Sequence, residues 1–262
     1  MAGAGLGGTA ERRERILGLV HERGDALVSE LKTLFGVSEV TIRADLAALA
    51  QRGLLVRTHG GAAVPRRPSS ELTFATREVS NVDLKRRIGL AAADLLQDGQ
   101  SVVLDASTTA LQIARAVRAR GTLRDVTVIT NGVHTALELL DVPGVSTILT
   151  GGQLRATAVS LTGALAADLL GKVHASVGFF GSRGLTVSHG LTDVNLQEVE
   201  MKRAMAGVCE RVVAVVDHTK LGEVSLATFV PLADLHAVIT DSAAEPNIVA
   251  DLRHAGVEVR LV

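Results

Sequence analysis

The chain has 262 residues, of which 47% are hydrophobic and 21% are charged. This balance is typical of a globular protein of one or two domains and excludes an intrinsically disordered chain. Lys and Arg number 27 and Asp and Glu number 28, so the net charge of -1 excludes a uniformly basic nucleic-acid coat. The single cysteine, Cys209, excludes a disulfide framework and a cysteine-rich zinc site.

The sequence also lacks the patterns of membrane, metal and cofactor proteins. No apolar stretch reaches the roughly 18 residues that cross a bilayer, and residues 1–10 lack the features of a secretory signal. The histidines form no pair at metal-binding spacing, and no dinucleotide or phosphate-loop glycine motif is present. We therefore expect a cytoplasmic protein with no membrane partner, no metal, no cofactor and no catalytic residue.

Charge is distributed unevenly along the chain. Residues 1–67 contain ten Lys or Arg against seven Asp or Glu, a net of +3, and the remainder contains 17 against 21, a net of -4. A small basic segment before a larger acidic one suggests two functions, with nucleic acid as a candidate partner of the first.

Residues 9–64 show three helical patterns separated by short turns. Thr9, Ser29 and Ser38 are expected to cap these helices. Two short extended runs around a Gly-Gly turn follow the third helix. Two helices joined by a short turn, followed by a hairpin, predict a winged helix-turn-helix domain.

The apolar positions define the inner face of this domain. In the second helix Leu34 is expected to point inward, and in the third Ile42, Leu46 and Leu49 recur at helical spacing before Gly53 ends the helix. The outer face of the third helix and the wing then present polar or small residues that suit phosphates and base edges. These candidate DNA-binding residues are Ser38, Val40, Thr41, Arg43, Ala44, Arg57, His59 and Gly60. The alternative is a three-helix packing module that binds no DNA.

The same segment resembles the N-terminal domain of DeoR-type bacterial transcriptional regulators. The motifs that carry the resemblance are Ser38-Glu39-Val40-Thr41-Ile42-Arg43-Ala44-Asp45-Leu46, Gly53-Leu54-Leu55 and Arg57-Thr58-His59-Gly60-Gly61-Ala62. The family usually carries a second Arg where this chain has Ala44, so one candidate phosphate or base contact is missing here. Residues 65–81 are predicted to be a linker, in which Pro65 to Ser70 should be extended and exposed.

Residues 82–262 alternate between β-branched apolar runs and helical patterns. Strands are expected at Ser101–Asp105, Val126–Thr130, Ser146–Thr150, Ala175–Phe180, Val212–Asp217, Ala237–Thr240 and Val257–Val262. Helices are expected near 83–97, 108–119, 133–140, 160–171, 195–210 and 245–254. This alternation predicts an α/β domain with a doubly wound, mostly parallel sheet.

Small and polar residues follow these predicted strands. Because such sheets bind ligands beyond the carboxyl ends of their strands, hydroxyls, glycines and cations at that edge suggest a small anionic ligand such as a phosphorylated sugar or polyol. The candidate effector-binding residues at this edge are Asp105, Ser107, Thr108, Thr109, Asn131, Gly151, Gly152, Arg155, Asp193 and Lys220. In any one loop the same residues are also ordinary strand-ending residues.

These loops are similar to the DeoR-type effector domain, whose fold is that of sugar-phosphate isomerases. The resemblance implies that Ser107-Thr108-Thr109 hold phosphate, with Asp105, Asp193 and Lys220 around the sugar. Lys85 also matches a family position, and it either points at the ligand or is a solvated residue at a helix start. Family members commonly have Ser-Gly where this chain has Ala106-Ser107, which shifts a hydroxyl by one position.

Two functions fit these patterns. The favoured one is a transcriptional regulator, most simply a repressor of a sugar or polyol catabolic operon, that binds double-stranded operator DNA as a homodimer or homotetramer and responds to a phosphorylated sugar. The alternative is a sugar-phosphate isomerase with an added DNA-binding module. Against the enzyme, no compact acid-base pair stands beside the hydroxyl loop, and Glu198 and Glu200 are expected to lie on a helix surface.

Overall fold

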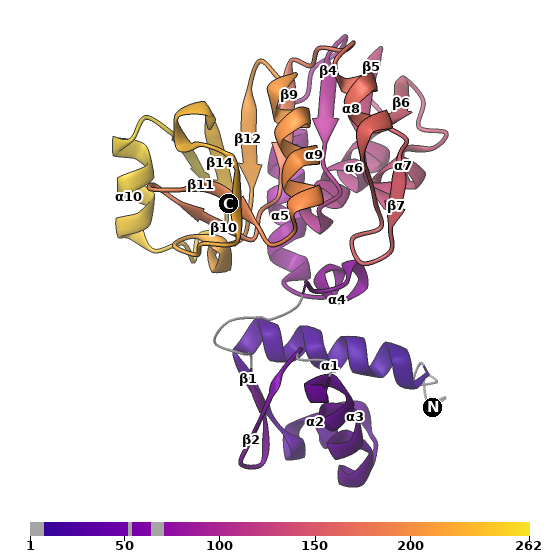
Figure 1. Ribbon diagram of the computed structural model, residues 1–262, viewed down its shortest axis with the longest axis vertical. Coiled ribbons are helices and arrows are strands. Elements are labelled where there is room, and N and C mark those ends of the chain that lie inside the picture. The colour runs from indigo at the N-terminus through magenta and orange to yellow at the C-terminus, as the bar shows by residue number, and fades with distance from the viewer. Residues whose placement is uncertain (1–7, 52–53, 64–70) are drawn as a thin grey trace. The chain divides into compact units, whose positions relative to one another are not determined.

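The chain divides into two compact units, with the boundary between Val82 and Asp83 (Figure 1). The computed structural model describes residues 8–51, 54–63 and 71–262. The predicted helix end at Gly53 and the predicted extended segment 65–70 lie outside these residues. Across the three described stretches, no helix has the length and apolarity needed to cross a membrane.

The N-terminal unit is a three-helix domain with a small antiparallel sheet. Its elements are α1 (Thr9–Arg23), β1 (Asp25–Leu27), α2 (Val28–Phe35), α3 (Glu39–Gln51), β2 (Val56–Thr58), β3 (Gly61–Ala63) and α4 (Phe74–Glu78). The strands pair in the order β1-β3-β2, so the hairpin of β2 and β3 forms a wing beside the helices. This arrangement confirms the predicted winged helix-turn-helix.

Three details of the N-terminal helices differ from the prediction. Gly8 occupies the N-cap of α1, so Thr9 is the first helical residue rather than the cap. Helix α2 begins at Val28, because the side chain of Glu30 accepts the N–H of Leu27 at 3.2 Å, so Ser29 lies inside the helix. Leu34 is 54% exposed, because its neighbours on the helix already fill the inner face.

The segment before the second unit contains a helix that the sequence did not reveal. Thr73 caps α4 by accepting the N–H of Thr76 at 3.2 Å. The residue after this helix, Val79, lies so close to Gly18 of α1 that a Cβ at Gly18 would come within 2.9 Å of it. Residues 71–81, which were predicted to belong to a linker, therefore pack on the N-terminal unit.

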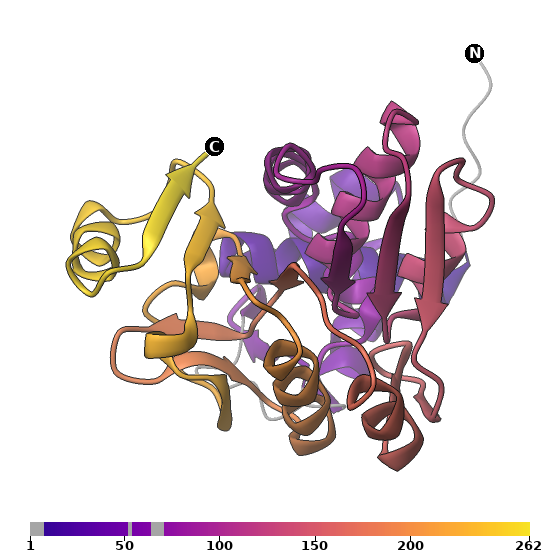
Figure 2. The ribbon, with the colours of Figure 1, turned by 90° about the horizontal axis from the view of Figure 1, so that it is seen from above.

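The second unit is built on a seven-stranded parallel sheet in the order β15-β14-β12-β9-β4-β5-β6 (Figure 2). The strands are β4 (Ser101–Leu104), β5 (Val126–Thr130), β6 (Val145–Leu149), β9 (Val177–Phe180), β12 (Val212–Val215), β14 (Ala237–Thr240) and β15 (Glu258–Leu261). Each coincides with a predicted strand to within about two residues at either end.

Helices cover both faces of this sheet, as Figure 2 shows, so the predicted doubly wound architecture is confirmed. On one face α5 (Val82–Ala93) and α6 (Thr108–Arg120) pack over Val102, Leu104 and Val128. The helices on the other face are α8 (Ala164–Leu170), α9 (Leu196–Gly207) and α10 (Pro246–His254). Alternate strand residues point to opposite faces, so two apolar cores form.

Two smaller sheets complete the unit. Strands β7 (Gln153–Arg155) and β8 (Ser160–Thr162) form a hairpin, and β10 (Gly184–Thr186), β11 (Gly190–Asp193) and β13 (Ala227–Val230) form an antiparallel sheet. The predicted helix 160–171 is wrong over its first residues. Residues 160–162 pair with β7 instead, and the N–H of Leu161 donates to the carbonyl of Asn131 at 2.8 Å.

Candidate functional site

Helix α3 is placed by its apolar side and capped by its first polar residues. Ile42 and Leu46 are fully buried against α1 and α2. Ser38 accepts the N–H of Thr41 at 3.2 Å and meets its hydroxyl at 2.9 Å, so the predicted cap at Ser38 is confirmed. The opposite side of the helix is therefore left to solvent.

The exposed side of α3 carries the residues that were predicted to meet DNA. Val40 is 76% exposed, and Ser38, Arg43 and Ala44 are also exposed, whereas Thr41 is half-buried. Arg43 faces Glu39 with an N–O distance of 3.8 Å, and both side chains are about half exposed. An exposed pair at this distance is weak, so a phosphate or a base edge can displace Glu39.

Asp45 anchors α3 and was overlooked by the sequence analysis. Its carboxylate is 1% exposed and accepts from the Nε atoms of Arg12 and Arg13, both at 2.7 Å. Both arginines lie on α1, so this cluster fixes the orientation of the helix that presents Arg43. The acidic residue inside the apolar stripe of α3 was a signal for such a buried pair.

The wing presents its predicted residues to solvent. Arg57 lies in β2, and His59 and Gly60 form the turn to β3, where all three are exposed. Gly60 has a φ of +96°, a backbone conformation that a tight hairpin turn needs and that glycine adopts without strain. The exposed face of α3 and the wing are the two candidate DNA-contacting surfaces of this unit.

In the second unit, three strand-end loops meet beside β4. A Cβ on Gly132, after β5, would lie 2.9 Å from the Cα of Ala106, and one on Gly181, after β9, would lie 2.5 Å from the Cβ of Ser107. Both glycines are therefore required by close approach rather than by turn geometry. The loops after β4, β5 and β9 thus lie in contact, as the sheet order predicts for neighbouring parallel strands.

Asp105 and Ser107 build the turn between β4 and α6. Asp105 is fully buried, and its Oδ1 accepts the N–H of Ser107 at 3.0 Å while its Oδ2 accepts the N–H of Gly181 at 3.1 Å. The hydroxyl of Ser107 in turn accepts the N–H of Ala110 at 3.0 Å and caps α6. The first amides of α6 have no intrahelical acceptor and favour an anion.

Lys202 is a further buried charged residue that the sequence did not reveal. It lies on α9, is 6% exposed, and donates to Asp193 at 2.7 Å and to the carbonyl of Gly181 at 2.9 Å. Its Nζ is also 3.2 Å from Asp105. Burial alone would lower the pKa of Lys202, but the carboxylates of Asp193 and Asp105 outweigh burial and raise it above its ordinary value.

The ion pair with Lys202 shifts the pKa of Asp193 downward. Burial tends to raise the pKa of Asp193, yet Lys202 and Arg183 together hold it below its ordinary value. Both partners are therefore charged at neutral pH. Asp193 and Asp105, which were predicted to surround a sugar, are thus brought together through an internal cation.

The expected surface position of Glu198 is wrong. Glu198 is 4% exposed, lies one helical turn before Lys202, and accepts from Arg155 at 2.5 Å and from the hydroxyl of Ser160. It is buried because the β7–β8 hairpin, whose second strand was predicted to be helical, packs on this side of α9. Arg155, predicted to meet the ligand, is consequently paired with a carboxylate. Glu200 is exposed, as expected.

The other predicted effector residues fall into two groups. Thr108 and Thr109 are the first residues of α6, and Asn131 follows β5; all three are buried. Asn131 donates to the carbonyl of Leu161 at 3.2 Å, while its Oδ1 has no hydrogen-bond partner among the described residues. The second group lies on other segments: Lys85 on α5, Gly151 and Gly152 between β6 and β7, and Lys220 at the end of a short 3-10 helix after β12. Of these, Lys85 is 6% exposed, so it is not a solvated residue at a helix start.

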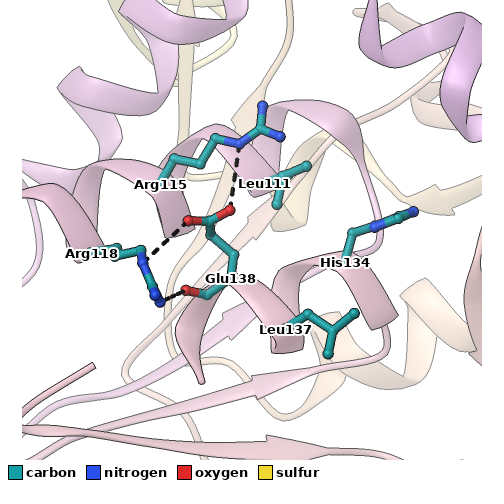
Figure 3. A pocket seen from close by; sticks show the side chains of 6 residues that line it. All are labelled: Leu111, Arg115, Arg118, His134, Leu137 and Glu138. Carbon is teal, nitrogen blue, oxygen red and sulfur yellow. Dashed lines mark hydrogen bonds and ion pairs between the residues drawn. The ribbon is translucent and has the colours of Figure 1, made fainter. Parts of the chain in front are cut away.

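A pocket of about 250 Å³ lies between α6 and α7 (Val133–Leu139). As Figure 3 shows, Arg115 and Arg118 both point toward Glu138, while His134 points away from these ion pairs. Arg118 also donates to the carbonyls of Glu138 and Leu140, at 2.8 and 3.0 Å. Both arginines are therefore paired with the end of α7. This pocket is separate from the strand-end loops described above.

The described residues contain no group of three or more His, Cys, Asp or Glu that could hold a metal ion. Cys209 is half-buried against the core, and burial raises the pKa of its thiol to about 12, so it stays protonated at neutral pH. Asp217, which follows β12, accepts both the N–H and the hydroxyl of Thr219 and is committed to its own turn.

Comparison with known proteins identifies both units. The DeoR-like helix-turn-helix domain matches residues 12–67, and the DeoR C terminal sensor domain matches residues 80–242. The chain belongs to the DeoR family of transcriptional regulators. The resemblance inferred from the motifs is thereby confirmed, and the second unit of this regulator is a sensor domain.

Relatives match the regulator over nearly its whole length. The HTH-type transcriptional regulator GolR of Listeria innocua serovar 6a is 36% identical, covering 96% of this chain and 98% of that protein. A putative aga operon transcriptional repressor of Escherichia coli O157:H7 is 37% identical, covering 97% and 94%. The glycerol-3-phosphate regulon repressor of Escherichia coli K12 is 29% identical, covering 96% and 98%.

These relatives are named as regulators and repressors rather than as enzymes, so the isomerase alternative is not supported. Among solved structures, ribose 5-phosphate isomerase from Methanocaldococcus jannaschii resembles the chain with a TM-score of 0.40 at 18% identity, covering 54% of this chain and 55% of that one. A likeness of this extent carries no argument about activity.

Proposed function

We propose that this regulator represses a sugar or polyol catabolic operon and that a phosphorylated sugar or polyol changes its affinity for operator DNA. The observation that supports DNA binding is the exposed face of α3, where Arg43 stands opposite the buried Ile42 and Leu46. The residues proposed to contact DNA are Ser38, Val40, Thr41, Arg43, Ala44, Arg57, His59 and Gly60.

The active form is proposed to be a homodimer or a homotetramer. One recognition helix makes few base contacts, and two copies on half-sites about one turn (~34 Å) apart read a palindrome with higher affinity. Sedimentation of the purified chain would measure this directly. A monomer that binds its operator at full affinity would contradict the proposal.

The proposed effector site is the group of loops around the start of α6. Its support is the buried cluster of Ser107, Thr108 and Thr109 at a helix N-terminus. The neighbouring loop after β5 carries Asn131, whose buried Oδ1 has no hydrogen-bond partner within the described part of the chain. Amides and hydroxyls suit a phosphate, and carbonyl or carboxylate oxygens suit sugar hydroxyls. One relative is named as a glycerol-3-phosphate regulon repressor, and a phosphate ester of a polyol agrees with this chemistry.

The decisive experiment measures operator binding with and without candidate effectors. DNA from upstream of the regulator's own gene is titrated by fluorescence anisotropy, and phosphorylated pentoses, hexoses and glycerol 3-phosphate are first screened by thermal shift, since a bound ligand stabilises the native state. We expect one class of phosphate ester both to raise the melting temperature and to change DNA affinity. A ligand that does only the first would contradict its role as effector, and appreciable isomerisation of any sugar would contradict a purely regulatory role.

A further inference from the structure

Lys202 connects three separate parts of the sensor unit. Its Nζ lies 2.7 Å from Asp193 at the end of β11, 3.2 Å from Asp105 after β4, and 2.9 Å from the carbonyl of Gly181 after β9. Its ammonium also lies 5.0 Å from the centroid of the Phe229 ring. An ammonium group has three N–H donors, and the three oxygen contacts can use all of them.

Asp105 is occupied by the protein itself. Its Oδ1 accepts from the N–H of Ser107, and its Oδ2 receives the N–H of Gly181 and the ammonium of Lys202. With a fully buried side chain, Asp105 has the contacts of a residue that shapes a turn rather than one that meets a ligand. What it shapes is the turn in which Ser107 caps α6.

We infer that Lys202 is a positioning residue of the effector site. It holds Asp105, which shapes the turn into α6, against the loop after β9 and the end of β11. The N-terminal turn of α6, which begins with Thr108 and Thr109, then has its binding geometry before any ligand arrives. The loop geometry does not depend on which ligand binds, and only the step from positioning to affinity rests on the proposed function.

A purely structural role makes a different prediction. A buried ion pair that only stabilises the domain would, when broken, loosen the whole unit to a similar degree. A positioning residue instead loosens the loops that it contacts beyond the rest of the unit. The two roles therefore differ in which residues lose protection, because both of them predict a loss of stability.

Hydrogen exchange of the ligand-free full chain tests this distinction. Lys202→Met keeps the length of the side chain and removes its charge, and Leu252→Ala is the control, because Leu252 is fully buried on α10 and is not among the contacts of Lys202. We expect exchange of residues 105–110 and 179–184 to rise at least tenfold in Lys202→Met relative to Leu252→Ala. Equal protection of these segments in both variants would overturn the inference.

A milder variant covers the case in which Lys202→Met does not fold. Asp193→Asn removes one of the two carboxylate charges and leaves the contact between Lys202 and Asp105. Exchange of residues 105–110 should then rise by a smaller factor, about threefold, without a comparable rise in the α10 region. Exchange at the wild-type rate in these residues would again overturn the role of Lys202.

Calorimetry with ribose 5-phosphate and glycerol 3-phosphate as probes extends the test to binding. If the wild type binds either probe, the Lys202 inference requires at least a tenfold loss of affinity in Lys202→Met and wild-type affinity in Leu252→Ala, and equal affinity in all three overturns it. If the wild type binds neither probe, these two phosphate esters are excluded as effectors, while the exchange measurement still decides whether Lys202 positions the loops.

Discussion

The exposed side of α3, which we propose to contact DNA, and the strand-end loops of the sensor unit use charge in opposite ways. Arg43 is exposed and only weakly paired, so it is available to an external partner. Lys202 is buried and makes three short contacts within the protein, so its charge organises other residues. Substitutions of separate exposed residues have independent effects, whereas substitutions within a buried network affect one another.

This difference explains why the two departures from the family pattern have different weight. Ala44 is exposed on α3, so the difference from the arginine that is usual in the family concerns one exposed side chain. Ala106-Ser107 lies in the loop where Ser107 both caps α6 and touches Asp105 through its amide. The hydroxyl of Ser107 is therefore part of the turn as well as a candidate ligand contact.

The largest effect on stability is expected at Asp45, because this residue is a buried charge in the DNA-binding unit, whose proposed contact residues are mostly exposed. Asp45→Ala leaves Arg12 and Arg13 without their shared carboxylate and should lower the free energy of unfolding of this unit by about 3 kcal/mol, the lower end for a broken buried pair, because Arg13 still reaches water. Denaturant unfolding followed by circular dichroism measures the loss. The exposed Asp25→Ala is the control, and a loss below about 1 kcal/mol would show that the cluster is not structural.

The next effect tests the sensor loops without disturbing their packing. Thr108→Val replaces a hydroxyl by a methyl group of similar size, and the loss of one hydrogen bond to a charged ligand should weaken the effector response by roughly tenfold to a hundredfold. Operator binding without effector should be unchanged. Thr122→Val, on the exposed loop after α6, is the matched control. A normal response in Thr108→Val would place the phosphate elsewhere.

A comparable effect on the exposed side comes from Arg43. Arg43→Ala should weaken operator binding by about 1–3 kcal/mol, roughly 5- to 160-fold at matched salt, and leave the melting temperature unchanged. Arg211→Ala removes an exposed arginine of the sensor unit that is paired with Glu258 and serves as control. Unaltered affinity in Arg43→Ala would refute the assignment of this helix face to DNA.

The smallest effect is expected from introducing a charge on the exposed side of α3. Ala44→Arg restores the arginine that is usual in the family, on a position that is exposed in the free protein. If the new side chain reaches a phosphate, the slope of log affinity against log salt should steepen by about 0.9 per contact, with no change in stability. An unchanged slope would indicate that Ala44 faces a base edge or solvent rather than the backbone of the operator.

The sequence by itself determined the order and type of most elements. The winged helix-turn-helix, the seven parallel strands and the buried face of α3 all follow from periodicity, because a helix or strand repeats its apolar positions locally. The cap at Ser38 was equally local, since donor and acceptor lie three residues apart. The outward position of Arg43 followed from the same periodicity. The caps predicted at Thr9 and Ser29 were displaced by one and two residues, to Gly8 and Leu27.

Only the tertiary structure decided which charges meet. Asp105 and Lys202 are almost a hundred positions apart in the chain, and Arg155 pairs with Glu198 across 43. Nothing in the local pattern of α9 marks Glu198 and Lys202 as buried, because a helix with polar residues on both sides reads as a surface helix until the loops and the hairpin pack on it. The desolvation that gives these residues their roles is a property of that packing, and it exists only once distant segments have come together.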